Sequence, residues 1–191
     1  MKETSDYTYI NDHKSVYIKG LKDGLPICMG YLSVSFTFGM MAVERGLPSY
    51  LALLISMTNL TSAGQFAGTA IMVSHGPLLE IAATTFVINL RYLLMSLAIS
   101  QKADPQLSLF QRLVLSFGVT DEVFAVSMQQ PGYIKGAYLA GLITLPYLGW
   151  SLGTLLGATT TGLLSLSVRS ALGIAIYGMF IAIIIPPARH A

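Results

Sequence analysis

The chain has 191 residues, of which 53% are hydrophobic and only 10% are charged. A soluble domain usually has about 25% charged residues, and one of this length has too much surface for its volume to hide so many apolar side chains. The net charge of +2 comes from scattered basic residues, which does not indicate a nucleic-acid partner. The single cysteine, Cys28, excludes an internal disulfide framework. We therefore predict an all-α integral membrane protein that is solvated by the lipid bilayer.

Six hydrophobic windows follow a polar N-terminal tail at residues 1–23. The tail lacks the apolar core and small-residue cleavage site of a signal peptide. A membrane-spanning helix needs about 20 mostly apolar residues, and turn-forming residues separate the windows. We predict one transmembrane domain over residues 24–191, with helices at residues 25–43, 50–73, 78–100, 107–128, 137–158 and 171–185.

The second predicted helix has a polar interruption at its midpoint, residues 58–65. Asn59, Ser62 and Gly64 favour a broken helix, and a half-helix that begins near Gly64 would attract a carboxylate. Such backbone is tolerated in lipid only where it is buried or lines a cavity. The alternative is a helix-packing face built on Gly64 and Gly68. Packing alone explains Asn59 and Gln65 less well.

Three ionisable residues lie deep in the predicted spans: Arg91 in the third helix, and Asp121 and Glu122 in the fourth. Each costs about 2.5–3.5 kcal/mol on insertion scales. They form either a polar transport pathway or a buried pair that fixes two helices. Adjacent helical residues point about 100° apart, so only one carboxylate can face Arg91 squarely. The other is a candidate proton site.

Short sequence matches suggest an internal repeat. Residues 50–55 resemble residues 138–143, and residues 62–68 resemble residues 151–157. A repeat of three plus three helices would be inverted, because three is an odd number, and inverted repeats are common in secondary transporters. The alternative is a chance likeness between hydrophobic helices.

The distribution of lysine and arginine predicts the orientation. Lys14, Lys19 and Lys22 precede the first predicted helix, which places the N-terminus in the cytoplasm. With six spans, Lys135 and Arg189 also lie inside. The residues left outside are then Arg45, Lys102, Arg112 and Arg169.

The chain has no motif for catalysis. We find no nucleophile elbow and no phosphate-binding loop. His13, His75 and His190 lack metal-ligand spacing with other ligands. We therefore expect no enzyme activity, no catalytic residue, no cofactor and no metal site.

Four short motifs resemble one known family. Residues 20–26 (GLKDGLP), 65–67 (QFA), 89–91 (NLR) and 120–122 (TDE) resemble the large subunit of the bacterial branched-chain amino-acid exporters, the AzlC family. The resemblance runs from about residue 20 to the end of the chain. It implies export of valine, leucine, isoleucine and methionine across the inner membrane, driven by an ion gradient, with a small hydrophobic partner subunit.

Two features depart from this family pattern. The polar tail before Lys19 is not part of it, and the chain stops soon after Pro187, where the pattern leads us to expect further hydrophobic sequence. The sequence therefore resembles either a C-terminally shortened copy of an exporter subunit or a subunit whose remaining part is supplied elsewhere.

Two functional hypotheses follow. In the first, a carrier binds a zwitterionic amino acid between the second, third and fourth helices. Arg91 or backbone N–H groups near residues 62–65 hold its carboxylate, and Asp121 or Glu122, with the Asn59 or Asn89 carbonyl, hold its ammonium. Its side chain lies near Phe66, Phe86 and Phe124. In the second, the protein is a non-transporting membrane scaffold or sensor subunit whose buried charges only lock the helix bundle.

Overall fold

The computed structural model describes residues 13–163 and residue 167. Over this part of the chain the predicted all-α class is confirmed, and short loops join the helices. In chain order the elements are α2 (His13–Glu44), α3 (Ser49–Thr58), α4 (Ala63–Val73), α5 (Leu78–Lys102), α6 (Leu109–Ser116), α7 (Asp121–Met128), α8 (Gly136–Thr160) and the 3-10 helix η1 (Thr161–Leu163).

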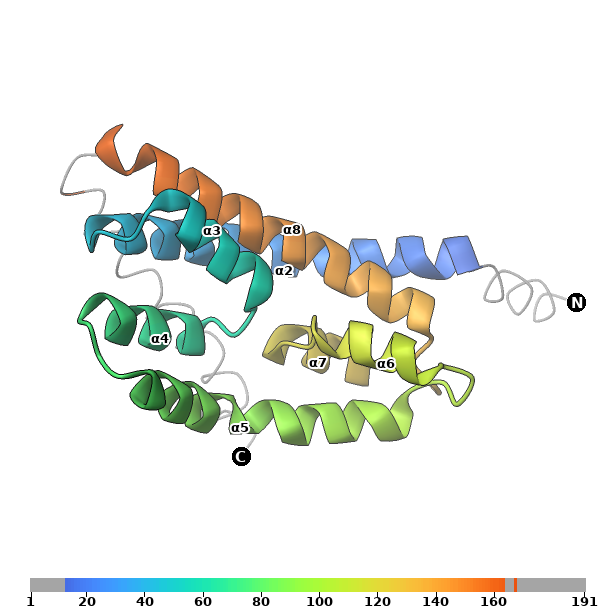
Figure 1. Cartoon of the computed structure of the whole chain (residues 1–191). Coiled ribbons are helices and arrows are strands. Elements are labelled where there is room, and N and C mark those ends of the chain that lie inside the picture. The colour runs from blue at the N-terminus through green and yellow to red at the C-terminus, as the bar shows by residue number, and fades with distance from the viewer. Residues whose placement is uncertain (1–12, 164–166, 168–191) are drawn as a thin grey trace, which may run out of the picture.

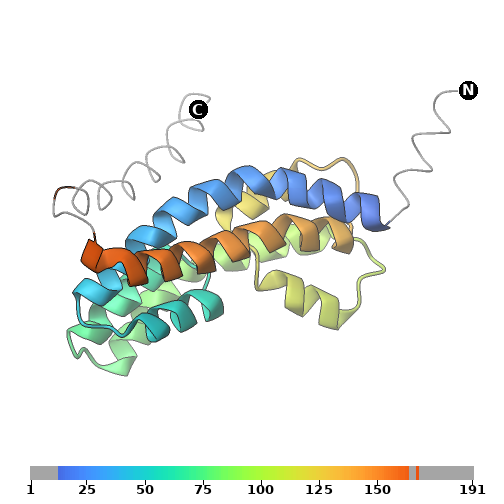
Figure 2. The same cartoon turned by 90° about the horizontal axis from the view of Figure 1, so that it is seen from above.

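Among the described residues, three helices are long and apolar enough to cross a membrane: α2, α5 and α8. A helix of 25 residues, such as α5 or α8, is about 37 Å long at about 1.5 Å per residue, enough for a hydrocarbon core of about 30 Å. Figures 1 and 2 show α2 and α8 side by side and running in the same direction. α5 runs in the opposite direction on the other side of the molecule (Figure 1).

The four remaining α-helices form two hairpins that enter the bundle from opposite ends (Figure 1). Hairpin one consists of α3 and α4, and hairpin two of α6 and α7. Their helices have 8 to 11 residues, so each is only about 12 to 17 Å long and too short to cross a bilayer. Each hairpin turns back at mid-depth, at residues 59–62 and 117–120 respectively.

Hairpin two and α8 repeat hairpin one and α5 in inverted orientation. Helix boundaries recur at a spacing of 58 residues: Thr58 and Ser116, Ala63 and Asp121, Leu78 and Gly136, Lys102 and Thr160. The units are inverted because α5 and α8 run in opposite directions (Figure 1). This pairing differs from the predicted one, which matched residues 50–55 with residues 138–143. The first of those segments lies in a hairpin and the second in a continuous helix, so their likeness reflects shared hydrophobic composition.

The structure corrects several predicted helices. The first helix begins at His13 rather than at Leu25. Polar residues can be helical outside the hydrocarbon core, and hydropathy detects only the apolar part of such a helix. The second is broken as predicted, but its halves form a hairpin. The fourth, predicted as one span over residues 107–128, is also a hairpin, so six spans are not confirmed. The predicted helix at residues 171–185 lies outside the described residues.

Glycines bring α2 and α8 into backbone contact along a seam. A Cβ atom on Gly39 would lie 2.1 Å from the carbonyl oxygen of Thr154, and one on Gly157 would lie 1.9 Å from that of Phe36. Gly20 and Gly141 make similar approaches near the other end of the pair. Small residues allow such close packing between helices in lipid, where no hydrophobic force drives helices together. The seam forms the frame to which both hairpins attach.

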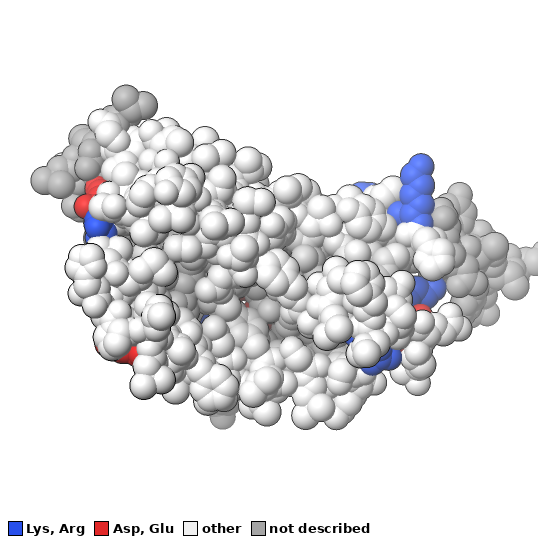
Figure 3. Space-filling view, in the orientation of Figure 1, with Lys and Arg blue, Asp and Glu red and all other residues white. Residues whose placement is uncertain are grey.

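Basic residues gather at the end of the bundle where α2 and α8 begin, which we call the basic end. Every described lysine and Arg112 lie there, whereas Arg45, Glu44 and Glu80 lie at the opposite end. The prediction that Lys102 and Arg112 lie across the membrane from Lys135 is wrong: the Lys102 carbonyl accepts a hydrogen bond from Ile134 N at 2.8 Å. The error arose because the hairpins do not cross. Charged atoms mark both ends in Figure 3, with an almost uncharged band between them.

Candidate functional site

The tips of the two hairpins meet α5 at mid-depth. At the tip of hairpin one, Gly64 in the first turn of α4 lies close to Asn89 of α5, since a Cβ at position 64 would lie 3.1 Å from both side-chain amide atoms of Asn89. At the tip of hairpin two, Asp121 begins α7 and contacts Arg91, two residues further along α5. Two half-helix N-termini, which favour negative charge, therefore lie near one region of α5. Figure 3 shows a depression at the centre of this face with blue and red atoms inside it.

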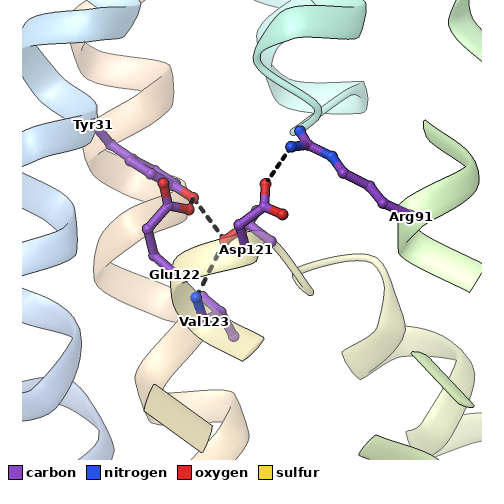
Figure 4. Close-up of polar contacts among 6 residues, drawn as sticks. Tyr31, Arg91, Asp121, Glu122 and Val123 are labelled. Atoms are coloured by element: carbon purple, nitrogen blue, oxygen red, sulfur yellow. Dashed lines mark hydrogen bonds and ion pairs between the residues drawn. The ribbon is translucent and has the colours of Figure 1, made fainter. Parts of the chain in front are cut away.

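Arg91 and Asp121 form an ion pair between α5 and hairpin two (Figure 4). Arg91 Nη1 lies 3.0 Å from Asp121 Oδ2, and the side chains are 40% and 31% exposed in the isolated chain. They are therefore neither sealed in a core nor on an outer surface. This half-buried setting allows a ligand to reach the pair.

Glu122 points away from Arg91 and toward α2 (Figure 4). Its Oε2 is hydrogen-bonded to the hydroxyl of Tyr31, which also lies 2.6 Å from Thr120 Oγ1. Thr120 caps α7, because its Oγ1 accepts a hydrogen bond from Val123 N at 3.4 Å. Tyr31 and Thr120 are both buried, and the ring of Tyr31 packs edge-on against Trp150 of α8 at 5.2 Å. The two adjacent carboxylates thus face different helices.

Three buried polar atoms beside the hairpin tips have no hydrogen-bond partner among the described residues: Ser62 Oγ, Asn89 Oδ1 and Arg91 Nε. A buried donor or acceptor without a partner costs about 1–3 kcal/mol. Asn89 Oδ1 can only accept and Arg91 Nε can only donate. Ser62, at the start of α4, has a left-handed backbone with φ 46°. These groups are equipped to bind a ligand that carries both donors and acceptors.

Gln65 lies in a neutral network that the structure separates from the charged pair. Gln65 is 1% exposed; its Nε2 donates to Ser56 Oγ at 2.6 Å, and its Oε1 accepts from Trp150 Nε1 at 3.0 Å. Ser56 Oγ also lies 2.7 Å from Thr154 Oγ1. These bonds attach hairpin one to α8. The bond from Thr61 Oγ1 to Asn59 Oδ1, at 2.6 Å, is local to the same tip.

Sequence reasoning selected the charged residues but missed their neutral partners. Trp150 was assigned no role from the sequence, and Tyr31 was not singled out. The available signal was their depth, because the hydroxyl of a buried tyrosine and the N–H of a buried tryptophan usually have a hydrogen-bond partner. Phe86, suggested for the side-chain pocket, is 63% exposed in this chain, so it is not packed inside the bundle.

Comparison with known proteins places the fold among membrane proteins. The family described as AzlC protein matches residues 26–164. A membrane protein of Archaeoglobus fulgidus is 36% identical over 180 residues, covering 92% of this chain and 78% of the relative. The inner membrane protein YgaZ of Escherichia coli is 26% identical over 178 residues, covering 90% and 73%. A Helicobacter pylori membrane protein is 25% identical over 149 residues, covering 74% and 64%. No solved structure matches.

Proposed function

Since this chain belongs to the AzlC family of membrane proteins, which is connected in general with branched-chain amino-acid transport, we propose that it is a secondary carrier rather than an enzyme. It exports valine, leucine, isoleucine and methionine, and an ion gradient drives the export. Secondary carriers bind their substrates near the bilayer midplane between inverted repeats, beside interrupted helices. Both features are present here.

The proposal rests on two buried polar atoms at mid-depth, one a donor and one an acceptor, that have no hydrogen-bond partner among the described residues. Arg91 Nε has no acceptor and Asn89 Oδ1 has no donor among the described residues. The two side chains lie two residues apart on α5, so Asn89 faces the tip of hairpin one and Arg91 faces Asp121 at the tip of hairpin two. A zwitterionic amino acid supplies the matching carboxylate and ammonium. A non-transporting scaffold would not need these groups to remain unpaired.

The arrangement suggests how the substrate is oriented. Its carboxylate binds Arg91 and the N-terminal turn of α4, at the positive end of the helix dipole. Its ammonium binds Asn89 Oδ1 and Asp121. Phe66 is half-buried near the tip of hairpin one and packs against Phe38 with ring centroids 5.2 Å apart. It offers an apolar contact to a branched side chain.

We further propose that the basic end faces the cytoplasm of a bacterial cell, with the protein in the inner membrane. The positive-inside rule counts lysine and arginine near the ends of spans. Within the part of the chain that the structure describes, five lysines and Arg112 lie at the basic end, against Arg45 alone at the opposite end. Because AzlC proteins generally operate with a small partner, we assign the exposed apolar face of α5 to contact with lipid and a small hydrophobic partner subunit.

Ligand-dependent stability of the purified protein tests the proposed function. A ligand that binds only the folded protein raises its melting temperature, so we expect leucine to stabilise the wild type and glutamate to have no effect. Arg91→Met and Asn89→Leu should abolish the leucine effect, whereas Arg112→Met, at the basic end, should retain it. If leucine stabilises none of the proteins and Arg91→Met only lowers stability, the scaffold alternative is correct.

A further inference from the structure

Glu122 and Asp121 are adjacent in sequence but have partners of different kinds. Asp121 pairs with Arg91, whose guanidinium is charged at every physiological pH. Glu122 contacts a hydroxyl, that of Tyr31, which is neutral. If Asp121 took up a proton, Arg91 would lose its counter-charge at mid-depth, which is costly. Protonation of Glu122 breaks no ion pair. It removes the one charge among Arg91, Asp121 and Glu122 that has no counter-charge.

We infer that Glu122, and not Asp121, carries the proton that couples transport to the proton gradient, and that Tyr31 and Thr120 are positioning residues that respond to its protonation. The inference rests on the proposed function as a carrier. It also names the driving ion, which the proposed function leaves open.

The hydroxyl chain can satisfy Glu122 in both protonation states. Tyr31 has one hydroxyl proton, so it can donate to only one of its two neighbours, Glu122 and Thr120, at a time. When Glu122 is ionised, Tyr31 donates to the carboxylate and Thr120 donates to Tyr31. When a proton from the aqueous phase binds Glu122, the carboxyl donates to Tyr31, and Tyr31 donates to Thr120. No bond is lost; each reverses its direction.

This reversal acts on the element that also holds the substrate. Thr120 caps α7 in both states, but it changes from donor to acceptor toward α2. Asp121 follows directly and contacts Arg91. A proton on one side of the first turn of α7 and a substrate on the other side therefore bias the position of the same eight-residue helix. By linkage, the factor by which protonation changes the affinity for substrate equals the factor by which bound substrate changes the affinity for the proton.

The groups that face Glu122 from the surrounding elements support this division of roles. α2 contributes Tyr31. α5 contributes Tyr92, which interacts electrostatically with Glu122, while Arg91 on the same helix faces Asp121. α7 contributes Asp121, and α8 packs the indole of Trp150 against Tyr31. Since Arg91 is engaged by Asp121, no cation among the described residues is directly paired with Glu122.

The test measures leucine affinity against pH for the full chain in lipid nanodiscs. Export driven by inward proton flow requires that protonation disfavour leucine, so the wild-type Kd should rise as pH falls, by up to about tenfold per pH unit for a single proton. Glu122→Gln, which keeps the shape and a donor for Tyr31, should bind leucine with a Kd that does not change with pH. Tyr31→Phe should retain pH dependence with its midpoint at higher pH, because ionised Glu122 loses a charge-assisted hydrogen bond that is stronger than the bond lost by the protonated carboxyl.

Proteoliposomes provide the second measurement. Glu122→Gln should still exchange internal for external leucine but should lose leucine-driven proton movement, measured with an internal pH dye. Glu122→Gln with wild-type pH dependence, or Tyr31→Phe with an unshifted midpoint, overturns the inference and leaves the proposed function standing. Wild-type protein that binds no leucine at any pH overturns both. If Glu122→Gln does not fold, the midpoint of Tyr31→Phe decides the question.

Discussion

The two hairpins have similar geometry but are held by different kinds of contact. Hairpin one is attached to α8 by a closed set of neutral hydrogen bonds that centres on Gln65. Hairpin two is held at its tip by the Arg91–Asp121 pair and the Glu122–Tyr31 bond. α6 has no buried residue, and a cavity of about 710 Å³ lies between α6 and the starts of α2 and α8.

This difference indicates which repeat moves. The neutral hydrogen bonds that attach hairpin one are satisfied, and breaking them leaves buried polar atoms unpaired, so this network resists rearrangement. Ionic contacts at half-buried positions can exchange partners with an amino acid or a proton. We therefore expect hairpin one to be a fixed half of the site and hairpin two to be the mobile half, opening toward the basic end. Inverted repeats commonly alternate access by such relative movement.

The comparison of the two hairpins depends on an intact α2–α8 seam, and Gly157→Leu should disrupt this seam. The leucine side chain would overlap the backbone of α2 at Phe36, so we expect no folded protein, measured as loss of a monodisperse peak on size-exclusion chromatography. Gly30→Leu is the matched control on α2, because a Cβ at Gly30 meets nothing within 4 Å. A folded Gly157→Leu protein would mean that the helices can separate.

Gln65→Met should weaken the fixed hairpin. Methionine fills a similar volume but leaves Trp150 Nε1 without its acceptor, so we expect the free energy of unfolding to fall by about 1–3 kcal/mol. Chemical denaturation in detergent measures this loss. Gln129→Met, at an exposed position after α7, should change stability by less than about 0.5 kcal/mol. Equal losses in both variants would remove the distinction between the hairpins.

Hydrogen exchange of the wild type should show the difference in mobility directly. Backbone amides of α6 and α7 should exchange at least about tenfold faster than those of α3 and α4, because local opening requires fewer buried contacts to break. Leucine should slow exchange in α7 more than in α4. Uniform exchange across the two hairpins, with and without leucine, would contradict a mobile hairpin two.

The smallest expected effect concerns the start of α6. Ser108 and Gln111 form a capping box, in which Gln111 N donates to Ser108 Oγ at 3.2 Å and Ser108 N donates to Gln111 Oε1 at 2.9 Å. Ser108→Ala should cost about 0.5–2 kcal/mol of local helix stability. We expect faster exchange confined to α6, with α3 and α4 unchanged. Ser116→Ala, near the other end of α6, is the control because its hydroxyl makes only a local bond to Leu113.

The sequence predicted one hairpin break and missed the other for a physical reason. The break in hairpin one is polar, with Asn59, Thr61 and Ser62 at mid-span, and polar residues there need an explanation. The break in hairpin two is mostly apolar, and its main signal is Gly118, whose Cβ would lie 2.2 Å from Ile143 Cγ2. Hydropathy cannot distinguish a span from a hairpin, because twenty apolar residues have the same composition whether or not the chain turns back.

The charged residues of the site were predictable, because ionisable groups at mid-depth are expensive and rare. The division of roles between Asp121 and Glu122 was only half predictable. Their adjacency showed that one of them would face away from Arg91, but the choice depends on how α7 is rotated, and hence on the cap at Thr120 and the position of Tyr31. These contacts join α2 to hairpin two across the sequence, beyond the reach of local patterns.

The glycine seam makes part of the chain intolerant of substitution at positions that touch no substrate. Gly39, Gly153 and Gly157 each face backbone atoms of the opposite helix at distances that exclude any Cβ. In a mutational scan scored by transport, these positions should be as sensitive as Arg91, and a line of intolerant glycines would resemble a second binding surface. Surface abundance measured in the same scan separates the groups: seam variants disappear from the membrane, whereas conservative variants of the charged site remain in it and are inactive.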